Sequence, residues 1–209
     1  MSDVVTVPPS GGGPGILLAH AWWGLNGFFR DLAGRLAEGG YVVHAVDLYD
    51  GKVASTVEEA EALMKAQDRA AVAGRVDAAL EALMAHPARH GERVGLIGFS
   101  MGAFNGVPAA MRHPEKFGAV VTFYGPFNGD LTKLRAPVLG HFAGEDEFDS
   151  VEYIQEFEQE LKSADVEATF HYYDGLAHWF FEADRPEYDA AAANLAWERT
   201  LAFIRKALG

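Results

Sequence analysis

The chain has 209 residues, of which 49% are apolar and 22% are charged, and its formal net charge at pH 7 is −13. These values are typical of a globular protein, and we expect residues 1–209 to form a single domain. The negative charge argues against nucleic-acid binding, which depends on clustered lysine and arginine, and the absence of cysteine excludes disulfides, thiolate metal sites and a cysteine nucleophile.

The N-terminal residues carry no recognisable targeting signal. Residues 1–10 lack the basic and apolar regions of a secretory signal, and no apolar run in the chain approaches the roughly 20 residues that span a bilayer. The absence of disulfides also fits a reducing compartment. We therefore expect a cytoplasmic protein without membrane contact, either a monomer or a small homo-oligomer.

The first elements are predicted to form a β-hairpin. Residues 4–7 are β-rich, the glycine-rich stretch 10–15 interrupts the pattern as a turn, and the apolar run 16–20 enters the core as a second strand. The glycines precede a strand and lack a following Gly-Lys-Ser/Thr, which argues against a phosphate-binding loop.

The remaining elements alternate between short apolar strands and longer amphipathic helices. The predicted helices cover residues 28–38, 58–67, 69–85, 103–112, 151–163 and 187–208. The predicted strands cover residues 41–46, 93–99, 119–124, 137–143 and 167–173. This order predicts an α/β fold: a mostly parallel sheet with helices on both faces, loops too short for a large cap domain, and ligands beyond the carboxyl ends of the strands.

A candidate nucleophile lies at one of these strand ends. Gly98-x-Ser100-x-Gly102 falls between a predicted strand and a predicted helix. In that context the motif is typical of a sharp turn that projects a serine hydroxyl above the sheet. The turn also places the amide of Met101 at a helix N-terminus, where a developing anion is favoured. A solvated serine in a glycine-rich turn is the alternative.

A serine nucleophile needs a base and an acid that orients the base, and both are expected downstream in the order acid, then histidine. Asp146 follows a predicted strand and His178 follows the next one. His20 also lies at a strand exit but precedes the serine, so His178 is the favoured base. Asp146 is the favoured acid because Gly144 permits a turn before it; the competing acids are Glu145, Glu147 and Asp149.

The loop after the first central strand is expected to complete the site. A second oxyanion-binding amide should come from this loop, and Trp22 is the best-placed donor. Its neighbour Trp23 suits either core packing or the wall of a substrate pocket. The other predicted pocket residues are Tyr124 and Trp179.

Together these residues resemble the dienelactone hydrolase family. The resemblance runs from about residue 15 to residue 208 and is carried by five motifs in order: His20-Ala-Trp-Trp-Gly-Leu-Asn26, Ala45-Val-Asp-Leu-Tyr49, Gly98-Phe-Ser-Met-Gly102, Gly144-Glu-Asp-Glu-Phe148 and Ala177-His-Trp-Phe180. It implies an α/β-hydrolase fold without a large cap, no cofactor and no metal, and hydrolysis of small esters or lactones. It assigns the triad to Ser100, Asp146 and His178, and the oxyanion amides to Trp22 and Met101.

Three positions depart from the pattern of the family's namesake enzymes. Ser100 replaces their cysteine, Ala21 replaces the glutamate that controls that thiol, and Glu182 aligns with an arginine that grips the substrate carboxylate. A carboxylate in place of this arginine would repel an anionic dienelactone, so we expect a neutral ester as substrate. One alternative is true dienelactone hydrolysis with Arg69 or Arg185 as the clamp. Another is a non-catalytic binding protein on a hydrolase scaffold.

Overall fold

The computed structural model describes residues 3–209. Met1 and Ser2, which begin the stretch considered above for a targeting signal, lie outside the described residues. Among residues 3–209, no helix combines the length and the apolar character required to cross a membrane.

Within residues 3–209, seven strands form one sheet in the order β1-β3-β2-β4-β5-β6-β7. All neighbouring strands are parallel except the edge pair of β1 and β3. The strands are β1 (Val4–Thr6), β2 (Gly13–Ala19), β3 (Val42–Val46), β4 (Arg89–Phe99), β5 (Phe117–Phe123), β6 (Val138–Ala143) and β7 (Ala168–Tyr173). The predicted α/β-hydrolase architecture is confirmed, and no cap domain covers the sheet within the described part of the chain.

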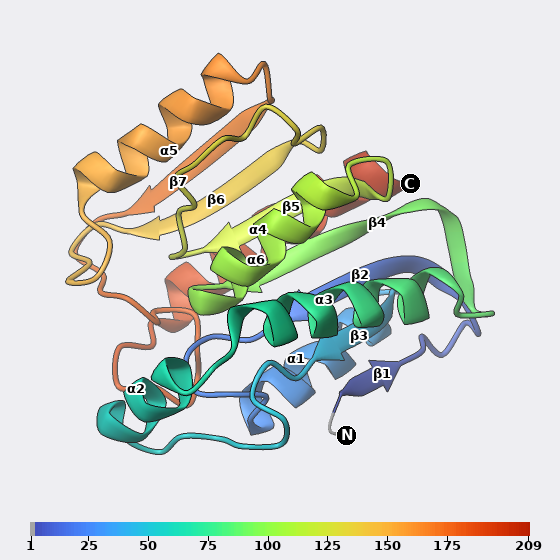
Figure 1. Ribbon diagram of the computed structural model, residues 1–209, viewed down its shortest axis with the longest axis horizontal. Helices are drawn as coiled ribbons and strands as arrows, with labels where there is room; N and C mark the ends of the chain where they lie inside the picture. The colour runs from blue at the N-terminus through green and yellow to red at the C-terminus, as the bar shows by residue number, and fades with distance from the viewer. Residues whose placement is uncertain (1–2) are drawn as a thin grey trace.

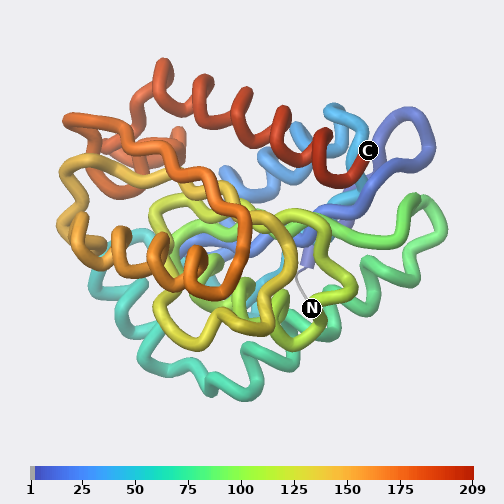
Figure 2. Tube along the Cα trace, turned by 90° about the horizontal axis from the view of Figure 1, so that it is seen from above, coloured from blue at the N-terminus to red at the C-terminus, as the bar shows by residue number. Residues whose placement is uncertain are grey.

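Residues 3–209 contain six helices, and five of them cover the two faces of this sheet (Figure 1). The six are α1 (Gly27–Glu38), α2 (Val57–Lys65), α3 (Arg69–Met84), α4 (Met101–Arg112), α5 (Val151–Ser163) and α6 (Ala190–Leu208). The helices α3, α4 and α5 pack on one face and α1 and α6 on the other, which Figure 2 shows from above. Each face therefore has its own apolar core.

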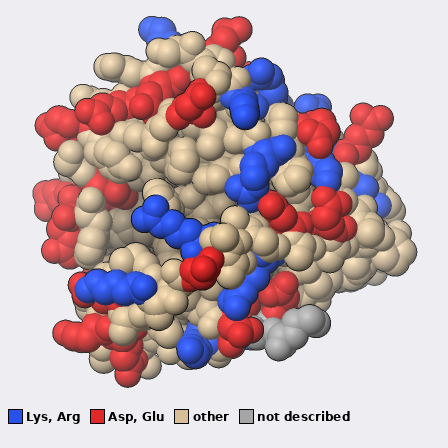
Figure 3. All heavy atoms as spheres, in the orientation of Figure 1, with Lys and Arg blue, Asp and Glu red and all other residues tan. Residues whose placement is uncertain are grey.

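The central strands are apolar on both sides because helices cover both faces. Every residue of β3 and β5 is buried, as expected for parallel strands inside a doubly covered sheet. Acidic and basic side chains are interspersed over the face that carries α3, α4 and α5 (Figure 3). The carboxyl ends of these buried strands carry the loops that form the candidate site.

The predicted N-terminal hairpin is wrong. β1 pairs with β3 in antiparallel register, with Val5 opposite His44, whereas β2 lies between β3 and β4 and has no free edge. The side chain of Asp3 helps to hold β1 in place, because its two carboxylate oxygens bond His44 Nε2 at 2.7 Å and the Asp47 amide at 2.9 Å.

The glycine-rich stretch is also only partly a turn, since β2 begins inside it, at Gly13. A Cβ at this position would overlap the backbone oxygen of Gly40, so glycine permits the close approach of two chain segments there. Other predicted boundaries are shifted by a few residues: β4 begins at Arg89, α4 at Met101 and α6 at Ala190.

Candidate active site

Ser100 occupies a strained turn between β4 and α4. Its backbone has φ 48° and ψ −114°, a combination that costs a non-glycine residue about 1–3 kcal/mol. The turn is held by a hydrogen bond from the Ser100 amide to the Phe123 carbonyl at 2.8 Å. A Cβ at Gly102 would overlap the backbone oxygen of Ala19, so α4 can begin this close to β2 only with glycine there. The turn directs the hydroxyl to the carboxyl edge of the sheet.

The structure brings the three predicted triad side chains into one hydrogen-bonded chain. His178 Nε2 lies 3.0 Å from Ser100 Oγ, and His178 Nδ1 lies 2.7 Å from Asp146 Oδ2. Asp146 comes from the loop after β6 and His178 from the loop after β7. The other carboxylate oxygen of Asp146 accepts the backbone amides of Phe148 and Asp149 at 2.9 and 3.1 Å. Both oxygens of the acid are therefore engaged, which fixes the orientation of the imidazole.

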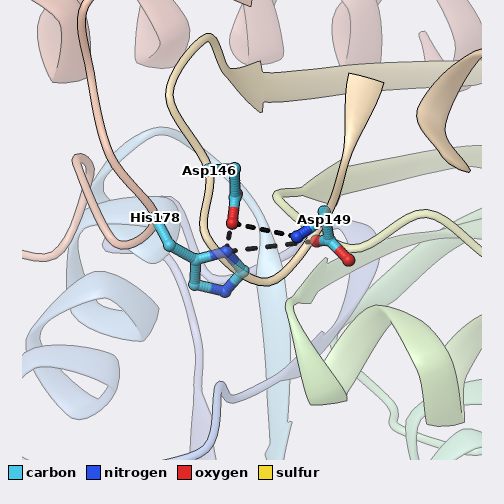
Figure 4. A group of neighbouring side chains, drawn as sticks. All are labelled: Asp146, Asp149 and His178. Carbon is cyan, nitrogen blue, oxygen red and sulfur yellow. Dashed lines mark hydrogen bonds and ion pairs between the residues drawn. The ribbon is translucent and has the colours of Figure 1, made fainter. Parts of the chain in front are cut away.

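A second carboxyl lies beside this chain (Figure 4). Asp149 Oδ2 is 4.0 Å from His178 Nδ1, and the Asp149 side chain is only 15% exposed. Burial raises the pKa of Asp149 to about 8, and the negative charge of Asp146 adds to this rise. Asp149 is therefore protonated at neutral pH and does not compete with Asp146 for the charged role.

The same three side chains, Asp146, Asp149 and His178, have ligand atoms within 4.8 Å of one another, as a cation site would require. Two of those atoms, His178 Nδ1 and Asp146 Oδ2, already share a hydrogen-bonded proton. A cation would have to displace that proton and a second one from Asp149. The donor set therefore suits proton sharing better than metal binding.

The two residues expected to supply oxyanion amides, Trp22 and Met101, line the same cavity as Ser100. Met101 is the first residue of α4, where backbone N–H groups have no partner within the helix. Trp22 lies in the loop directly after β2, the strand that α4 approaches through Gly102. Trp22, Ser100 and Met101 line the same cavity, an arrangement that can surround the oxygen of a carbonyl attacked by the serine.

This cavity measures about 580 Å³ and opens above Ser100 and His178. Its apolar walls come from Trp22, Met64, Phe104, Tyr124, Pro126, Phe148, Tyr153 and Trp179. Tyr124 and Trp179 thus lie where the sequence placed them, whereas Phe104, Phe148 and Tyr153 were not anticipated. Phe148 was within reach of prediction, because it directly follows the acid loop that bears Asp146.

Trp23 does not line the cavity. Its side chain is 3% exposed and belongs to the apolar core that faces α1 and α6. Its ring packs 5.1 Å from that of Trp179 and lies beneath the guanidinium of Arg185, 4.3 Å from the ring centroid. Of the two adjacent tryptophans, only Trp22 is placed to touch a substrate.

Glu182 is buried, which corrects the expectation that it repels an anionic substrate. It has no exposed surface, does not line the cavity, and accepts a 2.7 Å hydrogen bond from the Tyr124 hydroxyl. Burial raises the pKa of Glu182 to about 8, so the group is neutral at pH 7. The segment after His178 is a turn that begins with Trp179 at φ 66°, which directs Glu182 into the core instead of toward the cavity.

The two arginines considered as substrate clamps lie in different environments. Arg69, at the start of α3, lines the cavity together with Glu61. Arg185 stacks on Trp23 and lies 3.3 Å from a carboxylate oxygen of Asp184. Only Arg69 is placed to meet a group bound in the cavity.

Comparison with known proteins gives concordant matches. The profile of the dienelactone hydrolase family matches residues 2–208. The Aquifex pyrophilus protein usf is 29% identical over 214 residues, covering 96% of this chain and 91% of that protein. Carboxymethylenebutenolidase of Pseudomonas putida is 29% identical over 212 residues, covering 96% and 89%. Among solved structures, a dienelactone hydrolase-like promiscuous phosphotriesterase from metagenomic libraries superposes with a TM-score of 0.83 at 25% identity, covering 95% of this chain and 88% of that one.

Proposed function

The chain belongs to the dienelactone hydrolase family and is a hydrolase of carboxylic esters or lactones, and on this premise we propose that it cleaves small neutral esters through an acyl-enzyme on Ser100. The observation that carries the proposal is the continuous chain of hydrogen bonds from Ser100 through His178 to Asp146. This geometry is what a general base needs in order to activate a serine hydroxyl.

The proposed reaction has two stages. His178 Nε2 takes the proton of Ser100 as its oxygen attacks the ester carbonyl, and the resulting oxyanion is bound by the amides of Trp22 and Met101. Asp146 holds the Nδ1–H tautomer and stabilises the imidazolium. The protonated His178 then gives its proton to the leaving alcohol. Water attacks the acyl-enzyme with His178 again as base, which releases the acid and restores the serine.

The nucleophile is tested by Ser100→Ala and by labelling with a fluorophosphonate. We expect the parent enzyme to be labelled at Ser100 and the variant to lose nearly all hydrolysis of p-nitrophenyl acetate. The melting temperature, measured in parallel, shows that the variant remains folded. Equal rates for the parent and variant would contradict the proposal.

The choice of acid is tested by a matched pair in the same loop. Asp146→Asn leaves His178 without its charged partner and is expected to lower kcat on the order of 10³-fold or more. Asp149→Asn removes a carboxyl that is already neutral at pH 7 and should retain most of the activity there. The reverse order would assign the acid role to Asp149.

The preference for a neutral substrate rests on the cavity walls. They are mostly aromatic and apolar, and the acidic side chain of Glu61 lines the same space, which suits an uncharged acyl or alcohol group. Dienelactone hydrolysis is the second candidate, and the position of Arg69 favours it. We expect kcat/KM for a neutral short-chain ester to exceed that for an anionic dienelactone, and Arg69→Gln to change this ratio by less than about threefold. A preference for the dienelactone that Arg69→Gln abolishes would establish the second candidate.

The proposal treats residues 1–209 as one domain, because the seven strands that the structure describes join a single sheet. It also retains a cytoplasmic location and a monomer or small homo-oligomer. Size-exclusion chromatography with light scattering tests the oligomeric state.

A further inference from the structure

His20 is a buried histidine that the proposed reaction does not use. It directly follows β2 and has no exposed surface. Its Nε2 accepts a hydrogen bond from the Leu48 amide at 3.0 Å. Because that nitrogen is an acceptor, the ring proton lies on Nδ1, which donates to the Ala21 carbonyl at 2.7 Å. Burial lowers the pKa of His20 to about 4, so this neutral tautomer persists at neutral pH.

The Ala21 carbonyl that His20 bonds belongs to the same peptide unit as the Trp22 N–H. The Ala21 carbonyl and the Trp22 N–H are the two ends of one planar peptide and point in opposite directions. A hydrogen bond that draws the carbonyl toward the buried imidazole therefore turns the N–H away from it. The Gly24 amide also donates to the Ala21 carbonyl, at 3.3 Å, so His20 makes the shorter of the two hydrogen bonds that set the direction of the proposed oxyanion donor.

The loop that follows β3 also contacts the side chain of Met101, whose backbone amide is the second proposed oxyanion donor. Leu48 anchors His20, and the hydroxyl of the next residue, Tyr49, donates to Met101 Sδ at 3.2 Å. Asp47 shapes this loop, since its side-chain oxygens accept the backbone amides of Tyr49 and Gly51. The three residues Asp47, Leu48 and Tyr49 thus connect the loop after β2 with the start of α4.

We propose that His20 is a positioning residue that aims the Trp22 amide at the oxyanion, and that Leu48 and Tyr49 hold His20 and Met101 in register with each other. The proposal rests on the proposed function, because it concerns the oxyanion site of that reaction. It gives the Ala45-Val-Asp-Leu-Tyr49 motif a role that does not involve contact with substrate.

Two substitutions separate the two hydrogen bonds of His20. In His20→Asn the amide nitrogen can occupy the place of Nδ1 and still donate to the Ala21 carbonyl. In His20→Gln the amide oxygen can occupy the place of Nε2 and accept from the Leu48 amide, but the Ala21 contact is lost. Both variants bury an amide in the same space, so their losses of stability should be similar.

A matched control addresses the cost of replacing any buried imidazole. His141 in β6 also has no exposed surface, and its two ring nitrogens bond the hydroxyls of Tyr173 and Thr200 at 2.9 and 3.0 Å. These partners do not contact Ser100 or line the cavity. His141→Asn changes only the side chain and keeps the backbone carbonyl that accepts the Tyr124 amide, so it should lower the melting temperature while leaving kcat close to that of the parent.

The measurements are kcat and KM for p-nitrophenyl acetate, the inhibition constant of a trifluoromethyl ketone, and the melting temperature. Removal of one oxyanion donor typically costs about 10²–10³-fold in kcat, and a misdirected donor should cost part of this. We expect kcat of His20→Gln to fall at least about tenfold below that of His20→Asn, with KM within about threefold. The ketone, whose adduct with Ser100 carries an oxyanion, should bind more weakly in the same order.

The outcomes distinguish this inference from the proposed function. Equal kcat values for the Asn and Gln variants of His20, or an equal loss in His141→Asn, would overturn the positioning role even though Ser100→Ala remains inactive. An active Ser100→Ala would instead overturn the proposed function. If neither His20 variant folds, Tyr49→Phe is the second test: lower kcat at an unchanged melting temperature supports the inference, and parent-like kcat contradicts it.

Discussion

Glu182 is expected to make the stability of the protein fall as pH rises. The pKa of its buried carboxyl is raised to about 8, chiefly by burial, from a usual value of 4.5. Between these two values the native state holds a proton that the unfolded chain has released, so deprotonation favours unfolding. One pKa unit corresponds to about 1.4 kcal/mol, so the shift lowers the free energy of unfolding by about 3–5 kcal/mol as pH rises from below 4.5 to above 8.

Glu182→Gln removes this titration while keeping an oxygen that can accept the Tyr124 hydroxyl. We expect the free energy of unfolding of the variant, relative to the parent, to rise by about 3–5 kcal/mol between pH 5 and pH 9. Urea unfolding monitored by fluorescence at each pH measures the difference. Glu198→Gln, on the exposed side of α6, controls for the loss of one negative charge. Parallel stability curves for the parent and Glu182→Gln would refute the assignment of a neutral carboxyl at neutral pH.

Three further predictions concern the edge of the sheet around Ser100. Ionisation of Asp149 near pH 8 adds a negative charge 4.0 Å from His178 Nδ1, and this charge stabilises the imidazolium of the transition state. The kcat of the parent should therefore rise by up to about tenfold from pH 7 to pH 9. Asp149→Asn should lack this rise. Gly102→Ala should lower the free energy of unfolding by about 1–3 kcal/mol, because the added Cβ forces α4 away from β2. Gly74→Ala is the control: its Cβ meets open space, so it should stabilise α3 by about 0.5–1 kcal/mol. Thermal unfolding measures both. Ser100→Gly should be about 1 kcal/mol more stable than Ser100→Ala because glycine adopts its positive φ more readily, and equal melting temperatures would argue against strain at this turn.

Most of the fold could be predicted because the strands and helices differ clearly in length and apolar period. The proposed triad was also accessible from the sequence. Its members follow successive strand ends, and parallel strands bring their carboxyl ends to one edge of the sheet. Sequence order separated His178 from His20, and a preceding glycine favoured Asp146 over its acidic neighbours. These inferences needed only chain direction and local turn residues.

The predictions failed where tertiary packing decides which strand pairs with which and where a side chain points. Residues 4–7 were correctly predicted to contain a strand, but alternation along a strand cannot reveal that β1 pairs with β3 and not with β2. Two adjacent tryptophans gave no indication that Trp23 points into the core and Trp22 into the cavity. Glu182 was placed by its spacing from His178, as if one helical turn separated them. The positive φ of Trp179 turns the chain so that Glu182 points into the core. Such a conformation cannot be predicted from the sequence when the residue is not glycine.

Strain and order are concentrated at the same edge of the sheet. Three non-glycine residues with positive φ, Ser100, Tyr124 and Trp179, immediately follow β4, β5 and the candidate base. Such conformations persist only where the surroundings determine them. The amides of Ser100 and Tyr124 supply this constraint by donating to the Phe123 and His141 carbonyls at 2.8 and 2.7 Å. These hydrogen bonds extend the sheet beyond its regular strands. Ser100 and the Tyr124 ring, which packs 4.7 Å from His178, are therefore positioned by the core itself, before any substrate binds.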